Sequence, residues 1–129
     1  MPKNWKWEKL AQIAKWGSGG TPLSTNPAYY NGEIPWLIIG DMNDGNIYTS
    51  QKKITKLGLE NSSAKIVAPE SILIAMYGSI GKLGINKIPV ATNQAIAYTE
   101  KLNENINNKF LFHYLFHIRS KLHGLGKGG

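Results

Sequence analysis

The side chains best suited to chemistry in this sequence are three adjacent hydrogen-bonding residues, Thr92, Asn93 and Gln94. They precede a strand-like segment at 95–99 and follow a glycine-dense run at 80–85. Hydroxyl and carboxamide groups can each donate or accept a hydrogen bond, so at a strand end they suit recognition of a polar surface. We therefore expect these residues to read the surface of a partner.

The glycine-dense run resembles a phosphate-binding loop only in part. A P-loop needs G-x-x-x-x-G-K followed by Ser or Thr. Counting back from Gly81 and Lys82, the first glycine position holds Met76, and Leu83 stands where the hydroxyl residue belongs. The pattern therefore argues against a nucleoside triphosphate site. Two interpretations stay open: a tight hairpin turn, or a hairpin tip that faces DNA.

Lysine supplies most of the positive charge. The chain has a net charge of +7 and a pI near 9.6, which favours a polyanionic partner, nucleic acid first and an anionic membrane second. Its densest run beyond the N-terminus holds Lys52, Lys53, Lys56 and Lys65 with a single acid, Glu60. This run predicts either a solvated face or an edge that follows a phosphate backbone.

Aromatic and amide side chains are the other candidates for contact with bases. Tyr29, Tyr30, Tyr48 and Tyr77 lie in or beside predicted turns. Exposed rings near lysines suit stacking on nucleic acid, although tyrosine at a strand end is equally ordinary structure. Arg119 is the only arginine, so we expect Asn, Gln, Ser, Thr, Tyr and Lys to share any base reading.

The residue patterns of common enzymes are incomplete. Asn26 to Tyr29 read N-P-A-Y, like the N-P-x-Y motif of amino-methyltransferases, but no glycine-rich cofactor unit precedes them. His113 and His117 have helical spacing, but Tyr114 stands where a zinc H-E-x-x-H site needs glutamate. No Ser-His-Asp order or paired carboxylates stand out, so nothing indicates an enzyme. The absence of cysteine fits a reducing cytoplasm.

Strands are predicted to position the polar residues. The segments of strand length are 34–39, 47–54, 71–76, 80–85 and 95–99. The segments 71–76 and 80–85 are joined by a turn signal at 77–79 and predict a buried hairpin. Before them, 5–16 predicts an extended arm with one or two helical turns, ended by G-S-G-G at 17–20.

Two helices are predicted. A short one spans 55–63, weakened by Gly58, and an amphipathic one spans 109–122, with apolar residues at three- and four-residue spacings. A polar linker at 100–108 precedes the second helix, and a flexible glycine-rich tail at 124–129 follows it. The cap and stop signals are Thr55, Asn107 or Asn108, and Gly124.

The length of 129 residues allows one domain with its own core, which we place at 1–123. No apolar run reaches the roughly 18 residues that a membrane span requires, and the lysine-containing N-terminus lacks the apolar core of a signal peptide. We therefore expect a cytoplasmic protein with no membrane role.

Five short motifs in order carry a resemblance to a known family. A-M-Y-G-S-I-G-K at 75–82, followed by T-N-Q-A at 92–95, resembles the target recognition domain of type I restriction-modification specificity subunits. The other segments that fit are 7–10 with 17–22, 30–36 with Asp41, and Ile54-Thr55 with Gly58-Leu59. No single motif is specific, but their order is, and together they span about the whole chain.

The resemblance implies a mixed α/β or α+β fold: a twisted, largely antiparallel sheet, a few short helices and the C-terminal amphipathic helix. It implies sequence-specific recognition of double-stranded DNA without catalysis. The implied partners are modification (methyltransferase) subunits and a restriction subunit, with S-adenosylmethionine bound by the methyltransferase and no cofactor on this chain. A second recognition domain or self-association is also implied, and the tail at 124–129 would begin a missing spacer region.

Under this resemblance, lysines contact phosphates, and polar residues at turns and strand ends lie at or near bases. The phosphate group is Lys52, Lys53, Lys56, Lys82 and Lys87. The base-reading group is Tyr77, Ser79, Thr92, Asn93, Gln94, Tyr29 and Tyr30. Two alternatives stay open. The recognisable motifs can be architecture, with specificity in 24–31 or 41–59, or the chain can be a protein interaction module whose helix at 109–122 docks on a partner.

Overall fold

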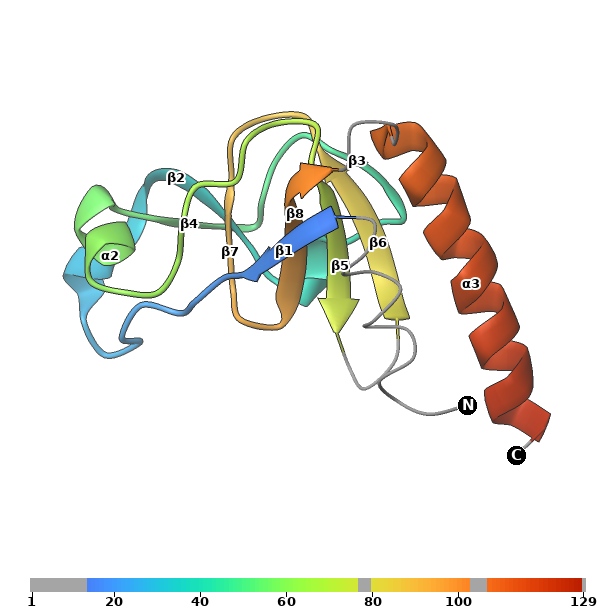
Figure 1. The fold of residues 1–129 in the computed structure, drawn as a ribbon. Coiled ribbons are helices and arrows are strands. Elements are labelled where there is room, and N and C mark those ends of the chain that lie inside the picture. The colour runs from blue at the N-terminus through green and yellow to red at the C-terminus, as the bar shows by residue number, and fades with distance from the viewer. Residues whose placement is uncertain (1–13, 77–79, 103–106, 129) are drawn as a thin grey trace.

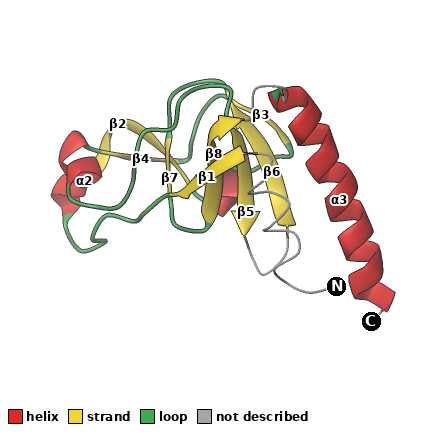
Figure 2. Ribbon diagram, in the orientation of Figure 1, coloured by secondary structure: helices red, strands yellow, loops and turns green. Residues whose placement is uncertain are grey.

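A computed structural model of the chain describes residues 14–76, 80–102 and 107–128. They form a five-stranded sheet, a three-stranded sheet, a few short helices and one long C-terminal helix (Figures 1 and 2). This arrangement confirms the predicted α+β class. Tyr77, Ser79 and the predicted arm up to residue 13 lie outside the described residues. Within the described part of the chain, no helix is long and apolar enough to cross a membrane.

The larger sheet contains the predicted central hairpin. Its order is β1-β8-β5-β6-β3, with antiparallel pairs except for β3, which lies parallel to β6. The strands are β1 (Ala14–Ser18), β8 (Ile96–Leu102), β5 (Ile72–Met76), β6 (Ile80–Asn86) and β3 (Gly45–Ile47). Ile72 pairs with Ile85 and Ile74 with Leu83, so the two apolar runs form the expected buried hairpin.

The smaller sheet lies apart from the C-terminal helix. Its order is β4-β2-β7, with β2 antiparallel to β4 and parallel to β7. The strands are β4 (Lys52–Ile54), β2 (Tyr30–Leu37) and β7 (Ala91–Thr92). The short helices are η1 (Pro27–Tyr29), η2 (Ile39–Asp41) and α2 (Lys56–Glu60). Figure 1 shows α2, β2 and β4 at one end of the molecule and α3 at the other.

Alternation along β5 divides the core into two layers. Ile72 and Ile74 pack with Leu83 and Ile85 beneath the C-terminal helix, and Leu73 and Ala75 face the other way. The helix contributes Leu111, Phe112 and Leu115 to the first layer, and the second layer adds Leu37, Met42, Ile47, Val67, Val90, Ile96 and Tyr98. A third cluster fills the smaller sheet with Trp36, Ile54, Ala64 and Ala91.

The C-terminal helix α3 (Asn108–Gly128) begins as predicted and ends later. Asn107 Oδ1 accepts a hydrogen bond from the Phe110 N–H at 2.7 Å, which caps the first turn. The stop predicted at Gly124 is wrong, because the helix continues to Gly128. Glycine permits a left-handed stop without enforcing one, and inside a helix it costs only about 1 kcal/mol relative to alanine.

Polar contacts fix α3 at two places, on the turn before β5 and beside β6. Near its start, Asn108 Nδ2 donates to the Glu70 backbone carbonyl at 3.2 Å. Farther along, Arg119 Nη1 donates to Asp44 Oδ1 at 2.7 Å and to the Gly81 carbonyl at 3.1 Å. We name this second contact the Arg119 anchor. It joins the helix to both β6 and the turn before β3.

Three local predictions are wrong. The strand predicted over 47–54 is two strands, because Asp41 accepts a hydrogen bond from the Gln51 N–H and turns the chain between β3 and β4. The described end of the N-terminal segment is the strand β1 rather than a helical turn, since it pairs along β8. For the same reason β8 extends through Leu102 into the predicted linker.

Candidate nucleic-acid interface

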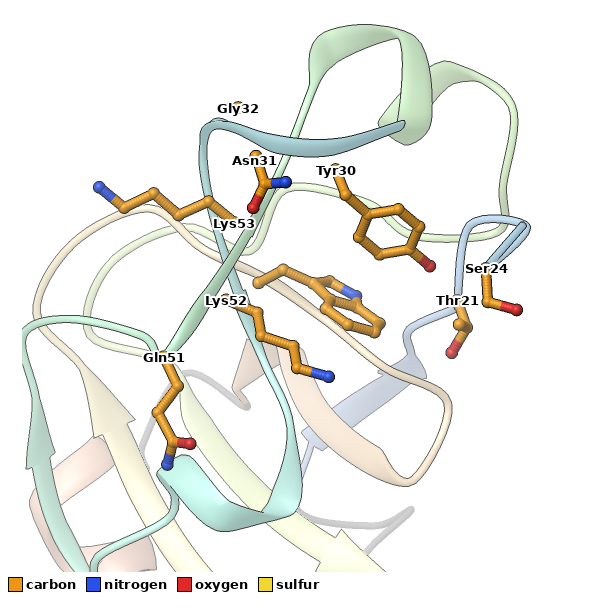
Figure 3. Close-up of a pocket in the computed structure, with 9 residues that line it drawn as sticks. Thr21, Ser24, Tyr30, Asn31, Gly32, Gln51, Lys52 and Lys53 are labelled. Atoms are coloured by element: carbon orange, nitrogen blue, oxygen red, sulfur yellow. The ribbon is translucent and has the colours of Figure 1, made fainter. Parts of the chain in front are cut away.

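A cavity of about 670 Å³ opens beside the smaller sheet (Figure 3). Its walls come from the segment before η1, from β2, and from β4 with the residue that precedes it. We name it the lysine pocket. The residues that line it are Thr21, Ser24, Tyr30, Asn31, Gly32, Trp36, Gln51, Lys52 and Lys53. Three predicted DNA contacts, Tyr30, Lys52 and Lys53, are thereby brought together from distant parts of the sequence.

Two aromatic residues give the pocket a fixed wall. Trp36 Nε1 donates to the Gly20 carbonyl at 3.0 Å, and the Tyr30 hydroxyl donates to the Pro22 carbonyl. The two rings meet edge to face, with centroids 6.1 Å apart. Because both polar groups are bonded within the protein, these side chains contribute shape and apolar surface rather than free donors.

Lys52 and Lys53 leave β4 in opposite directions. Lys52 lies opposite Trp36 in the β2–β4 register and Lys53 lies opposite Pro35, and successive strand residues alternate between faces. Figure 3 shows Lys52 extending towards the side of Thr21 and Lys53 extending away. Neither lysine takes part in an ion pair with a described residue, and no carboxylate lines the pocket. The pocket therefore carries uncompensated positive charge.

The threonine cap of α2 brings the short helices together. Thr55 Oγ1 accepts from the Gly58 N–H at 3.0 Å, as predicted, and donates to the Ala28 carbonyl at 2.7 Å. The Thr55 N–H donates to the Tyr29 carbonyl at 3.0 Å. A Cβ at Gly58 would lie 2.5 Å from that Tyr29 carbonyl oxygen, so only glycine allows α2 to approach η1 this closely.

Two more predicted contacts, Tyr29 and Lys56, lie at this end of the molecule. The Lys56 ammonium is 4.0 Å from the Glu60 carboxylate, with the side chains 86% and 58% exposed. Such a pair is weak in water, so Lys56 can exchange it for a phosphate. Five of the twelve predicted DNA contacts therefore lie at this end of the molecule, in and around the smaller sheet, and we name this region the small-sheet face. Its predicted members are Tyr29, Tyr30, Lys52, Lys53 and Lys56.

Asp41 fixes the chain that leads into β4. Its two carboxylate oxygens accept the Ile38 N–H and the Gln51 N–H, each at 2.9 Å. Gln51 Nε2 also donates to the Gly40 carbonyl at 3.3 Å. Since Lys52 follows Gln51 directly, the bond from Gln51 to Asp41 helps to position Lys52 in the lysine pocket.

The polar triplet at 92–94 is mostly structural. Thr92 is fully buried, and its Oγ1 has no hydrogen-bond partner within the described chain. Asn93 Oδ1 accepts the Ala95 N–H at 3.0 Å, which closes a turn. Only Gln94 is exposed, and its Oε1 accepts the Thr21 hydroxyl at the pocket wall. Thr92 therefore cannot touch DNA in this structure, whereas Gln94 adjoins the lysine pocket.

Lys82 and Lys87 lie on β6 and just after it, away from the small-sheet face. Lys87 Nζ lies 2.7 Å from Glu70 Oε1. This hydrogen bond from Lys87 is the main cause that holds the pKa of the Glu70 carboxyl below its usual value. Lys82 is exposed and forms no ion pair with a described residue. The charge of Lys87 is thus already paired, and Lys82 belongs to a different part of the surface.

Four polar pocket residues were not predicted individually from the sequence: Thr21, Ser24, Asn31 and Gln51. The last three lie in the segments 24–31 and 41–59 that were left open as alternatives for specificity. Asn31 carried a usable signal, since it stands between a tyrosine and a glycine in a turn-rich stretch. It adopts a left-handed backbone with φ of 61°, which asparagine tolerates better than most residues. The other three are ordinary loop residues, and only the fold brings them together.

The match to known proteins covers almost the whole chain. Residues 2–129 match the type I restriction modification DNA specificity domain. The chain belongs to this family. It is 32% identical over 115 residues to the EcoR124I/EcoR124II specificity subunit of Escherichia coli, covering 85% of this chain and 28% of that subunit. It is 33% identical over 97 residues to the MjaIX specificity subunit of Methanocaldococcus jannaschii, covering 73% of this chain and 22% of that subunit.

Solved structures of specificity subunits share the fold. The chain aligns with the HsdS subunit of Thermoanaerobacter tengcongensis with a TM-score of 0.60 at 17% identity, covering 88% of this chain and 27% of that one. It aligns with a chain from a study of type I restriction-modification complex assembly with a TM-score of 0.65 at 18% identity, again covering 88% and 27%. The chain thus spans about a quarter of the length of these specificity subunits.

The family is defined by DNA specificity and is not an enzyme family. Among the described residues no group of three or more His, Cys, Asp or Glu side chains is placed to hold a metal ion. The lysine pocket is a basic, concave surface with amide and hydroxyl groups.

Proposed function

We propose that this chain recognises a specific sequence of double-stranded DNA through its small-sheet face. The observation that carries the proposal is the lysine pocket, where unpaired positive charge lies beside amide and hydroxyl groups with no acid in the lining. Lys52, Lys53 and Lys56 contact phosphates and set the register of the duplex. Asn31 and Gln51 reach base edges, where carboxamides can recognise a donor–acceptor pair.

The proposed partners follow from family membership. A DNA specificity domain directs other subunits to their site, so we propose that this chain acts with modification and restriction subunits. S-adenosylmethionine then binds to the methyltransferase partner and not to this chain. We also propose a cytoplasmic location, where duplex DNA is accessible. A second recognition domain, or a second copy of this chain, would supply the other part of the target.

Salt-dependent binding tests the proposal. Fluorescence anisotropy of the purified chain with a pooled random duplex is measured at roughly 50 and 200 mM salt. Three phosphate contacts give a slope of about −2.7 in log affinity against log salt, or about a 40-fold loss over this range. Selection from the pool then yields the preferred sequence, which must bind more tightly than a scrambled duplex.

Two triple variants locate the contact surface. K52A/K53A/K56A removes the lysines of the small-sheet face, and K82A/K87A/K109A removes the same charge elsewhere. We expect the first variant to lose most binding and the second to retain it. An equal loss in both would mean that net charge alone attracts DNA.

If the chain alone binds no duplex at low salt, either the partner subunits supply the affinity or the DNA proposal is wrong. A further titration separates these two explanations. Addition of the cognate modification subunit restores binding if affinity is shared among subunits. If binding stays absent, the DNA proposal is refuted and the protein interaction module is favoured.

A further inference from the structure

The polar groups that line the lysine pocket differ in what they can offer a ligand. The Trp36 and Tyr30 donors are bonded to backbone carbonyls, and the Thr21 hydroxyl donates to Gln94. Gln51 already donates one amide hydrogen to a carbonyl. The lining side chains that have no partner within the described chain are Ser24, Asn31, Lys52 and Lys53.

The two lysines among them extend in different directions. Lys52 extends across the pocket towards the wall that holds Thr21 and Ser24, whereas Lys53 extends away (Figure 3). The pocket therefore offers one ammonium, one hydroxyl and one amide. Without a carboxylate in the lining, this set suits an anion whose oxygens only accept hydrogen bonds.

Shape decides which part of a duplex can enter. A concave pocket receives a ridge, and the ridge of a duplex is its sugar–phosphate backbone, because base edges lie at the floor of the grooves. Lysine, serine and asparagine side chains are common phosphate contacts in protein–DNA complexes. We infer that the lysine pocket seats one backbone phosphodiester of the target duplex, held by the Lys52 ammonium. This inference rests on the proposed function. It adds that one particular phosphate of the duplex is bound by one particular lysine.

The adjacent lysine provides a matched control. Lys53 carries the same charge on the same strand and is also exposed, but its ammonium extends away from the side of the pocket that Lys52 reaches (Figure 3). Removing Lys53 therefore weakens general attraction to the duplex and leaves the seated phosphate recognised. Removing Lys52 takes away the contact itself.

A methylphosphonate scan measures the contact directly. Each phosphate of the preferred duplex is replaced singly by a neutral methylphosphonate, and the Kd for the chain is measured. Among the phosphates that the unmodified chain contacts, the one seated in the pocket should show about a tenfold loss, the size of one charge-assisted hydrogen bond. Lys52→Ala should bind the natural duplex more weakly but show less than a twofold further loss at that position. Lys53→Ala and Lys52→Arg should both retain the tenfold sensitivity.

The outcomes distinguish failure of the phosphate seat from failure of the proposed DNA recognition. A Lys52→Ala chain with the same methylphosphonate profile as the unmodified chain overturns the phosphate seat and leaves DNA recognition intact. A unique loss of sensitivity in Lys53→Ala also overturns it. An unmodified chain that binds no duplex, even with the modification subunit, overturns the proposed function and the seat with it.

Discussion

Replacing Arg119 with alanine should loosen the C-terminal helix from the larger sheet. In the Arg119 anchor, Nη1 donates to Asp44 Oδ1 at 2.7 Å and to the Gly81 carbonyl at 3.1 Å. The guanidinium also lies 4.6 Å from the centre of the Phe116 ring. The substitution removes all these contacts and leaves the Asp44 carboxylate without its cation.

The size of the effect follows from burial. The Arg119 and Asp44 side chains are 18% and 34% exposed, between a surface pair and a buried one. Breaking a fully buried pair costs about 3–5 kcal/mol, and an exposed pair contributes about 0–1 kcal/mol. Because water partly screens this pair, we expect a loss of about 2 kcal/mol in the free energy of unfolding. For a chain of this size that lowers Tm by about 8 °C.

The pH dependence of the effect has a defined sign. Partial burial alone would raise the pKa of the Asp44 carboxyl, but the hydrogen bonds from Arg119 and from the Leu83 N–H, with nearby positive charge, hold it below its usual value. A carboxyl whose pKa is lower in the folded chain stabilises the fold above its unfolded pKa, about 3.9, and loses that stabilisation as pH falls through the folded value. The difference between the unmodified chain and Arg119→Ala should therefore be steady above about pH 5 and shrink below about pH 4.

Urea unfolding followed by circular dichroism at pH 7 and at roughly pH 3 measures both quantities. Lys82→Ala is the control, since Lys82 also lowers the Asp44 pKa but only through charge. We expect it to cost less than about 0.5 kcal/mol, as for an ordinary surface substitution. The reasoning is refuted if Arg119→Ala and Lys82→Ala are equally stable at pH 7.

Two further substitutions test the elements that support the small-sheet face. Gly58→Ala should destabilise the fold by about 1–3 kcal/mol despite the better helix propensity of alanine, because the new Cβ meets the Tyr29 carbonyl; Gly45→Ala, with no atom closer than 3.7 Å, should be much milder in the same thermal melt. Asp41→Asn should weaken DNA binding by about 3- to 10-fold by freeing the backbone before β4. Loss of a negative charge by itself should strengthen DNA binding, and the exposed control Glu33→Gln should show this effect. Tighter DNA binding by Asp41→Asn would therefore contradict a positioning role for Asp41.

Local pattern predicted the parts of the fold whose burial is continuous along the chain. The β5–β6 hairpin was evident because both strands are apolar and separated by a turn signal. A cap at Thr55, and one at Asn107 or Asn108, were evident because the capping bond goes to an N–H in the first turn of the same helix. Strand boundaries near β3 and β4 were not, because the break depends on Asp41, which reaches the chain from ten residues away.

The candidate site shows the same difference between features that local sequence predicts and features that only the fold determines. From the sequence, Thr92 was predicted to read bases. In the structure it is buried where residues 19 and 20 cross β7. A Cβ at Gly19 would lie 1.9 Å from the Thr92 carbonyl oxygen, and the Gly20 N–H donates to that oxygen at 3.0 Å. No local pattern encodes such a crossing, because its partners are far apart along the chain.

Three residues from the recognisable motifs have structural roles in the described chain. Thr92 closes the crossing, Asp41 fixes the chain before β4, and Gly58 lets α2 reach η1. The unpartnered pocket side chains lie instead in 24–31 and in 41–59, the two segments that the sequence left open as alternatives. A domain that must change its target while keeping its fold needs this separation. Substitutions at Ser24 or Lys52 remove no hydrogen bond within the described chain, so they can alter contacts with DNA at little cost in stability.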